Sequence, residues 1–332
     1  MNVDPVLSDG QEDGADLIEV GAVRVSPFTR PSPHGDKLRE LLSNPKLPAV
    51  DQPRVVAALA AYEQWISGMA ELSSVGDDRV ADLVQMLNEY KEKIEIDLIW
   101  DSSESFLYRQ KGQLKLDNSI LEEWFPWLVD PRIMPELEGI DLQVGPAKAF
   151  AAAHFQSVLT DVSGRPGLIV RSKDQDFTIG RQTYLRASFD KAFRNDHTDD
   201  SETYIAYVAA ELKTNLDKTM FQEATATSHD LRIAAPGSHY FLICEFLDMT
   251  PISSAGTDID EVLVLRGRRV GSQNRKNFSN AVYRRDHREE HLRRVRSTPV
   301  RIDVVQRFVN HVREILQNQR GDLSGAVERG YF

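Results

Sequence analysis

Two charged residues, separated by one apolar residue, stand at the end of a run that has the composition of a β-strand. The run over residues 203–210 is mostly apolar, and the chain then continues as Glu211-Leu212-Lys213. Residues two apart on a strand point to the same side, so Glu211 and Lys213 project together while Leu212 turns into the core. A carboxylate suited to a hard divalent cation would thus lie beside an ammonium group that can meet an anion. We interpret this pair as candidate catalytic residues.

The same charge spacing occurs once more in the chain, at Glu89-Tyr90-Lys91. The segment 82–93 around it has apolar residues at helical spacing, and residues two apart on a helix do not face each other. We therefore interpret that copy as a solvated helix face. For Glu211 and Lys213 the alternative interpretation is a strand end with two exposed charges.

An acidic partner for Glu211 is expected from the preceding strands. Residues 167–172 indicate a strand, and a polar stretch separates them from a second β-type run over 177–187. An acidic residue at the start of that second run can meet Glu211 across neighbouring strands. Asp176 is our choice because it opens the run, and Asp174 is the rival.

The segments after Lys213 predict a helix and two further strands. Residues 217–226 indicate a helix start, with Thr219 and Gln222 at the spacing of a capping box. Residues 239–247 and 261–265 are apolar runs typical of strands. The predicted order is thus a strand, a strand with an acid, a strand with Glu-x-Lys, a helix and a strand.

That order resembles the core of the PD-(D/E)xK nucleases, which implies an α/β (α+β) fold with a mixed central sheet flanked by helices. Within that superfamily, residues 173–177, 210–224 and 248–261 resemble the Bpu-type type II restriction endonucleases, which cut asymmetric DNA sites using two different catalytic subunits or sites. The resemblance spans about residues 95 to 280. This sequence departs from the family in one respect, because no Pro precedes Asp174 or Asp176 to mark the first acid.

The resemblance implies metal-dependent hydrolysis of phosphodiester bonds in duplex DNA at a specific sequence, within a restriction–modification defence system. Asp176 and Glu211 would bind Mg²⁺, with the Leu212 carbonyl as a third ligand. Lys213 would orient or deprotonate the attacking water. Gln222 would hold that water or a phosphate oxygen, or else serve only as a capping residue.

Two other functions remain open on the sequence. The chain could be a sequence-specific DNA-binding subunit with the nuclease fold and weak or no cutting of its own, or a nuclease directed at RNA or branched substrates. Because the strands of a duplex are antiparallel and one site cuts one strand at a time, double-strand cleavage needs a second site. We expect either a homodimer or a heterodimer with a related nuclease subunit.

The net charge of −11 is unevenly distributed along the chain. Residues 262–320 contain 14 Arg and one Lys against five acidic residues, a local balance of +10, which leaves −21 for the remainder. Such asymmetry indicates a surface for a polyanion, and Arg suits phosphate groups and guanine edges. The alternative is a solvated helix whose arginines pair with its own acids. The residues predicted to contact DNA are Arg266, Arg268, Arg269, Arg275, Lys276, Arg284, Arg285, Arg293 and Arg294.

Two other kinds of site are disfavoured. His287 and His291 have the i, i+4 spacing that could face one metal ion, but they lie among arginines, whose charge repels a cation. We assign both to the basic surface. The chain also lacks the Gly-x-x-x-x-Gly-Lys-[Ser/Thr] loop that cradles phosphates, so we expect no use of ATP.

The bulk composition is that of an ordinary globular protein, with 41% hydrophobic and 27% charged residues in 332. The single cysteine, Cys244, permits no disulfide or cysteine zinc site within one chain. No apolar run has transmembrane length, and the first residues lack the features of a signal peptide. We expect no membrane association and a cytoplasmic location.

The periodicity of apolar residues divides the chain into four parts. Helices are expected over 55–66 and 80–94, with a turn at 73–78, and a terminal helix over 300–318. The tryptophan-rich stretch 124–127 is expected to be buried packing. The four parts are a flexible or irregular arm (1–35), a mainly helical region (36–135), the nuclease core (136–270), and an Arg-rich DNA-facing segment with the C-terminal helix (271–332).

Overall fold

The computed structural model describes residues 32–158, 160, 164–271 and 275–318. The expected N-terminal arm (1–35) therefore lies outside the described residues except for 32–35, as does the end of the chain from 319 onwards. The strands are β1 (Gln143–Phe155), β2 (Leu168–Ser188), β3 (Thr198–Leu216), β4 (His239–Leu247) and β5 (Glu261–Arg268). The α-helices are α1 (Pro33–Leu42), α2 (Gln52–Glu71), α3 (Gly76–Lys93), α4 (Ser105–Gln113), α5 (Asn118–Trp124), α6 (Lys218–Ala234), α8 (Ala281–Asp286), α9 (Arg288–Ser297) and α10 (Ile302–Asn318). A π-helix, η1 (Ile94–Trp100), continues α3, and short 3-10 turns are η2 (Phe125–Leu128), η3 (Pro135–Leu137) and η4 (Asn195–His197).

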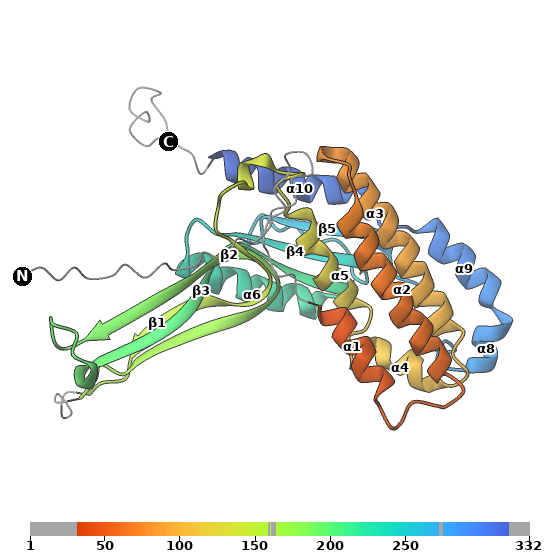
Figure 1. The fold of residues 1–332 in the computed structure, drawn as a ribbon, viewed down its shortest axis with the longest axis horizontal. Helices are drawn as coiled ribbons and strands as arrows, with labels where there is room; N and C mark the ends of the chain where they lie inside the picture. Colours follow the sequence, from red (N-terminus) through yellow and green to blue (C-terminus); the bar gives the residue numbers. More distant parts are fainter. Residues whose placement is uncertain (1–31, 159, 161–163, 272–274, 319–332) are drawn as a thin grey trace, which may run out of the picture.

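The five strands form one mixed sheet in the order β1-β2-β3-β4-β5. β2 runs antiparallel to both β1 and β3, whereas β3, β4 and β5 are parallel to one another. Parallel neighbours need a crossover connection, and α6 provides it between β3 and β4. The predicted mixed sheet with flanking helices is confirmed, and helices cover the part of the sheet drawn in the centre of Figure 1. No helix in the described part of the chain combines the length and the apolar character needed to span a membrane.

Two apolar cores lie on opposite faces of this sheet. The larger core joins the sheet to the N-terminal helices and to α10, and the smaller one lies under α6 around Phe221. The centre of the larger core is a group of aromatic rings with centroids 5.4–5.8 Å apart, formed by Phe125, Phe177, Phe241 and Phe308. These four rings come from η2, β2, β4 and α10, so one core connects the helical region with the sheet.

The helical region follows the prediction from the sequence. α2 and α3 lie side by side and are joined by a short turn close to the expected residues. The stretch 124–127 is buried, and the Trp124 indole N–H donates to the Leu83 carbonyl at 3.1 Å. The interpretation of this aromatic stretch as packing is confirmed.

β2 is one continuous strand of 21 residues, which corrects the expectation of two runs separated by a polar stretch. Residues 173–176 stay in the sheet because β1 pairs with them, with Lys173 opposite Ala149 and Asp174 opposite Lys148. The sequence did not indicate β1. Its central residues are mostly alanines, which lack the β-branched side chains that signal a strand.

β1, β2 and β3 extend beyond the helices as a three-stranded arm (Figure 1). Gly180 lies at a register shift between β2 and β3, where a Cβ atom would be 2.1 Å from the Ile205 carbonyl oxygen. Glycine is therefore required by the close approach of the two backbones. Further along the arm, Tyr184 and Phe189 are largely exposed, so this part of the sheet is not covered by a helix.

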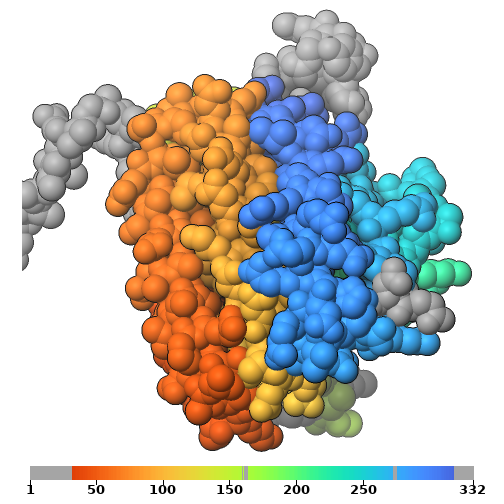
Figure 2. Space-filling model, turned by 90° about the vertical axis from the view of Figure 1, so that its right-hand side faces the viewer, coloured from red at the N-terminus to blue at the C-terminus, as the bar shows by residue number. Residues whose placement is uncertain are grey.

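The C-terminal helices return to the N-terminal region. The Asn88 side chain donates to the Val300 carbonyl at 3.0 Å and accepts from the Val300 N–H at 2.7 Å, and Arg296 pairs with Glu92 at 2.8 Å. Figure 2 shows the C-terminal helices, in blue, and the N-terminal helices, in orange, forming one continuous surface. The predicted terminal helix is confirmed as α10.

Four buried charged residues join α3 and η1 to the sheet, and we call them the buried ion cluster: Lys91, Glu95, Glu245 and Arg266. Lys91 Nζ lies 2.9 Å from Glu245 Oε1, and Arg266 contacts Glu245 Oε2 at 3.1 Å and also pairs with Glu95. Burial by itself would raise the Glu95 pKa, but Arg266 and Lys91 outweigh it and hold that pKa at about 2. The cluster is thus balanced, with two cations and two carboxylates. The expectation that Lys91 lies on a solvated helix face is corrected, because its side chain is only 2% exposed.

Candidate active site

Glu211 and Lys213 lie on one face of β3, as the spacing of strand residues predicts. Lys213 Nζ is 2.5 Å from Glu211 Oε1, and the Tyr240 hydroxyl donates to Glu211 Oε2 at 3.1 Å. The Lys213 and Glu211 side chains are 22% and 21% exposed, so the pair is open to solvent. Leu212 between them is fully buried in the larger core. The face that carries the pair is the α6 side of the sheet, because Tyr240 belongs to the smaller core.

Asp176 meets this pair from β2. Phe177 is opposite Ala210 in the antiparallel ladder, which places Asp176 beside Glu211. Asp176 Oδ2 accepts a hydrogen bond from the Leu212 N–H at 2.9 Å. The structure thus brings together three predicted site residues. Glu211 and Lys213 are two apart on β3, and Asp176 comes 35 positions before Glu211 in the chain. The rival residue, Asp174, is exposed and faces Lys148 on β1.

Burial and the mutual charges of these groups shift their pKa values. Burial raises the pKa of Asp176, although Lys213 and the Leu212 N–H act in the opposite direction. Burial would lower the pKa of Lys213, but the adjacent Glu211 carboxylate outweighs it, so the Lys213 pKa is raised. The ammonium of Lys213 is therefore firmly protonated, and Asp176 takes up a proton more readily than an ordinary aspartate.

The oxygen atoms of Asp176, Glu211 and the Leu212 carbonyl fit a hard divalent cation. Such an ion, and Mg²⁺ in particular, is commonly bound by one or two carboxylates and completes its coordination with water. Asp176 and Glu211 supply the carboxylates. The N–H and C=O of one residue in an antiparallel ladder face the same neighbouring strand, so the Leu212 carbonyl lies on the Asp176 side. Within the described residues no group of three or more His, Cys, Asp or Glu side chains could hold a metal ion.

The helix after β3 begins differently from the prediction. Asp217, not Thr219, caps α6, because its side chain accepts from the Met220 N–H at 2.9 Å. The capping role considered for Gln222 is therefore wrong, since Gln222 is in the second turn of the helix and exposed. The neighbouring residue Glu223 acts on Lys213 through its charge.

Two residues near the pair were missed by reasoning from the sequence. Tyr240 binds Glu211, and Glu223 adds a third carboxylate near Lys213. No motif marks either residue. Tyr240 is opposite Ala209 in the parallel register, two residues before Glu211 on β3, and Glu223 is on α6, the helix that follows β3.

Two of the arginines predicted to contact DNA are buried, and that part of the prediction is wrong. Arg266 belongs to the buried ion cluster. Arg284 is fully buried, and its guanidinium donates to four backbone carbonyls, those of Trp100, Ser102, Glu104 and Phe278. It therefore fixes α8 against the helical region and has no free face for a phosphate.

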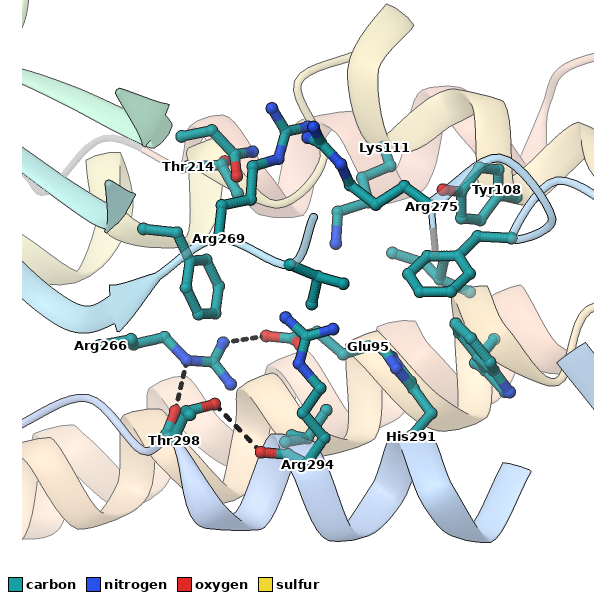
Figure 3. Close-up of a pocket in the computed structure, with 17 residues that line it drawn as sticks. Glu95, Tyr108, Lys111, Thr214, Arg266, Arg269, Arg275, His291, Arg294 and Thr298 are labelled. Carbon is teal, nitrogen blue, oxygen red and sulfur yellow. Dashed lines mark hydrogen bonds and ion pairs between the residues drawn. The ribbon is translucent and has the colours of Figure 1, made fainter. Parts of the chain in front are cut away.

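The other basic residues of the prediction divide into two groups. The first group is exposed and consists of Arg268, Lys276, Arg285 and Arg293. The second group lines a cavity and consists of Arg269, Arg275 and Arg294 (Figure 3).

The two histidines at i, i+4 spacing are held by aromatic rings. The His291 ring stacks on Trp100 with centroids 3.5 Å apart, and burial lowers the His291 pKa to about 3. His287 stacks on Tyr283 at 3.9 Å. The assignment of His291 to a charged basic surface is corrected, because its ring is half-buried and its lowered pKa leaves it uncharged at neutral pH.

The sequence and the fold of this chain are similar to those of known proteins. The model of the Bpu10I restriction endonuclease family matches residues 113–332. The structure described as "native BbvCI A2B2 tetramer at low resolution" has the same fold, with a TM-score of 0.53 and 19% identity over 87% of this chain and 98% of that chain. The curated proteins include no match. The chain belongs to the Bpu10I restriction endonuclease family.

Proposed function

We propose that this type II restriction endonuclease hydrolyses duplex DNA at a specific sequence with Mg²⁺ held by Asp176, Glu211 and the Leu212 carbonyl. Restriction endonucleases generally use divalent metal ions, and an all-oxygen donor set favours Mg²⁺ among them. The observation that carries the proposal is the meeting of Asp176 with the Glu211–Lys213 strand end at Leu212. The chain acts within a restriction–modification system. We expect it in the cytoplasm, where it would meet its DNA substrate.

Each side chain of the site has a defined task in this proposal. A bound divalent ion supplies Lewis acidity and lowers the pKa of a water molecule. The Lys213 ammonium, held protonated by Glu211, orients the attacking water and offsets the charge that develops on the phosphate. Gln222 is exposed on α6 and would hold the water or a phosphate oxygen. No group for ATP is required.

Binding to DNA is assigned to the exposed basic residues at the end of β5 and beyond it. Side chains that reach phosphates act independently of sequence and position the duplex. Four residues of the original prediction have exposed side chains, namely Arg268, Lys276, Arg285 and Arg293.

Double-strand cleavage requires a second catalytic site of opposite orientation. The BbvCI structure is described as an A2B2 tetramer, an assembly of two different kinds of subunit. By analogy we propose that this chain works with a second nuclease subunit, either a copy of itself or a related chain.

Supercoiled plasmid DNA tests these proposals. The full-length protein with Mg²⁺ should produce discrete nicked or linear species, and a chelator should abolish them. Glu211→Gln and Lys213→Ala should each abolish cleavage while DNA binding is retained. Glu89→Gln is the matched control, because Glu89 is the exposed carboxylate of the other Glu-x-Lys copy.

The outcomes separate the candidate functions. A smear would indicate a general nuclease, and retardation of DNA without any cleavage would indicate a DNA-binding subunit. If the chain alone only nicks, addition of a homologous chain should restore linear product. If this chain alone converts the plasmid directly to linear DNA, and sedimentation shows that it is a homodimer, then no different partner chain is needed.

A further inference from the structure

A cavity rich in cations lies beyond the carboxyl ends of β3, β4 and β5. It is lined by these strand ends, η1, α4 and α9 and is open on one side, and its volume of about 110 Å³ far exceeds the roughly 10–15 Å³ that one water molecule needs. Figure 3 shows basic side chains converging on it from several elements. The lining cations are Lys111, Arg266, Arg269, Arg275 and Arg294. Among the described residues the only carboxylate in the lining is Glu95.

Two of the five cations are matched by buried carboxylates. Lys111 Nζ is 2.6 Å from Asp117 Oδ2, and Asp117 is almost completely buried. Arg266 belongs to the buried ion cluster, in which two cations face two carboxylates. Glu95 forms its ion pairs within that cluster, and it acts on Lys111 and Arg294 only through its charge at longer range.

The remaining three arginines have too few partners. Arg269 and Arg275 share one carboxylate, that of Asp248, at 2.6 and 3.3 Å. The Arg294 guanidinium forms no ion pair or hydrogen bond with any described residue, although it points into the cavity (Figure 3). Burial and the positive charge of Arg266 lower the Arg294 pKa. In the described structure these three arginines share one ion-paired carboxylate, so the cavity keeps an excess of two positive charges.

An anion with two or more acceptor oxygens would satisfy these charges. Guanidinium groups present paired N–H donors that match phosphate geometry, and charge-assisted bonds of this kind are stronger than neutral ones. A metal ion would be repelled by the same cations. His291, which also lines the cavity, has a pKa of about 3 because it is buried, so it adds no charge at neutral pH.

The cavity is close to the catalytic strand end. Thr214 and Asn215 line it, and they directly follow Lys213 on β3. At about 3.3 Å per strand residue, the cavity wall lies roughly 3–7 Å further along the strand than Lys213. The cavity lies on the side of β3 that faces the helical region, whereas Lys213 lies on the α6 side. Phosphates follow one another every ~3.4 Å of helix axis on one DNA strand, so a duplex that crosses the carboxyl ends of the strands would bring a neighbour of the cleaved phosphate to the cavity.

We infer that this cavity is a binding site for a phosphate group, and that in the complex with substrate it receives a backbone phosphodiester near the cleaved bond. The second half of this inference rests on the proposed nuclease function, whereas the first half does not. Arg294 is the residue on which binding depends most, because its charge has no other partner.

Thermal unfolding in the presence of inorganic phosphate tests the first half. At constant ionic strength, with phosphate replacing chloride, Tm should rise in a saturable way for the wild type. The rise should disappear in Arg294→Gln and persist, weakened, in Arg294→Lys. Arg296→Gln is the matched control, since Arg296 is an exposed arginine of α9 that does not line the cavity and should respond like the wild type. An equal response in Arg294→Gln, or none in the wild type, overturns the phosphate site whatever the activity of the enzyme.

Competition between phosphate and DNA tests the second half. Without a divalent cation, replacement of chloride by phosphate at constant ionic strength should weaken duplex binding by the wild type but not by Arg294→Gln. The slope of log Kobs against log[salt] should also be smaller by about 0.9 in Arg294→Gln, which corresponds to one lost phosphate contact. Stabilisation by phosphate with no effect on DNA affinity would assign the cavity to free phosphate and overturn the backbone assignment. A cleavage failure alone would affect neither measurement.

Discussion

The Asp176 carboxylate accepts a hydrogen bond from the Leu212 backbone N–H, at 2.9 Å. This bond fixes the interior of β2 against β3 at the residue between Glu211 and Lys213. The first acid of the site is thus defined by the pairing of two strands, and no Pro-Asp signature is needed to locate it.

We expect Asp176→Asn to reduce single-turnover cleavage by about 100-fold or more, since the loss of groups that only support metal ligands already costs roughly 10–100-fold. Asp174→Asn is the matched control, because Asp174 is exposed and paired with β1. It should cleave like the wild type. If Asp174→Asn were the inactive variant, the metal ligand would be misplaced by two residues.

Removal of the Glu211 charge should lower the pKa of Lys213. That pKa is raised because the effect of Glu211 outweighs burial, and burial alone acts in the opposite direction. In Glu211→Gln, Lys213 should therefore react with an amine-selective reagent at lower pH than in the wild type, as followed by mass spectrometry. Glu89→Gln should leave the reaction profile unchanged. An unshifted profile in Glu211→Gln would show that Glu211 does not control the charge of Lys213.

The buried ion cluster should be essential for stability. Glu245→Gln leaves Lys91 and Arg266 short of one buried carboxylate, and breaking a buried pair costs about 3–5 kcal/mol of unfolding free energy. Arg186→Ala, which removes an exposed pair with Asp200, should cost at most about 1 kcal/mol. Urea unfolding measures both. Equal small losses would mean that Glu245 is replaceable by a neutral side chain.

Acidification should begin to destabilise the fold at pH values well above the range in which carboxylates titrate. His34 is fully buried and its Nε2 lies 2.7 Å from the Tyr90 hydroxyl, and burial lowers its pKa to about 3. Below about pH 6.5 the unfolded chain binds a proton at His34, whereas the folded chain binds this proton only below about pH 3. The contribution of His34 to the free energy of unfolding is therefore complete above pH 6.5. It is lost as pH falls from about 6.5 to about 3, by up to ~1.4 kcal/mol per pH unit.

His291 should contribute in the same direction, because its pKa is lowered to the same extent. Unfolding free energies at about pH 7 and about pH 5 isolate the histidines from most carboxylates. His34→Asn should show a smaller difference between the two pH values than the wild type. A difference of the same size would mean that His34 is not the group that takes up the proton.

The sequence predicted the features that depend on local periodicity. Glu211 and Lys213 share a face because strand side chains alternate, and α2, α3 and α10 follow from helical spacing of apolar residues. β1 was missed because an alanine-rich strand gains its stability from β2 and not from its own side chains.

The wrong prediction for two arginines has a different cause. Arg266 and Arg284 resemble their exposed neighbours in sequence, and only contacts with distant residues bury them. Arg266 meets Glu95, which is 171 positions away, and Arg284 meets the carbonyl of Trp100, which is 184 positions away. A count of charges along the chain carries no information about such partners.

The core that joins the N-terminal helices, the sheet and α10 has a consequence for the origin of new DNA specificities in this protein. Phe125, Phe177 and Phe308 contact one another although they come from three different parts of the chain. A chimaera that took the helical region from one relative and the sheet from another would have to match every ring and every charge of this junction. Specificity should therefore diverge by substitutions within an intact chain, and not by exchange of modules.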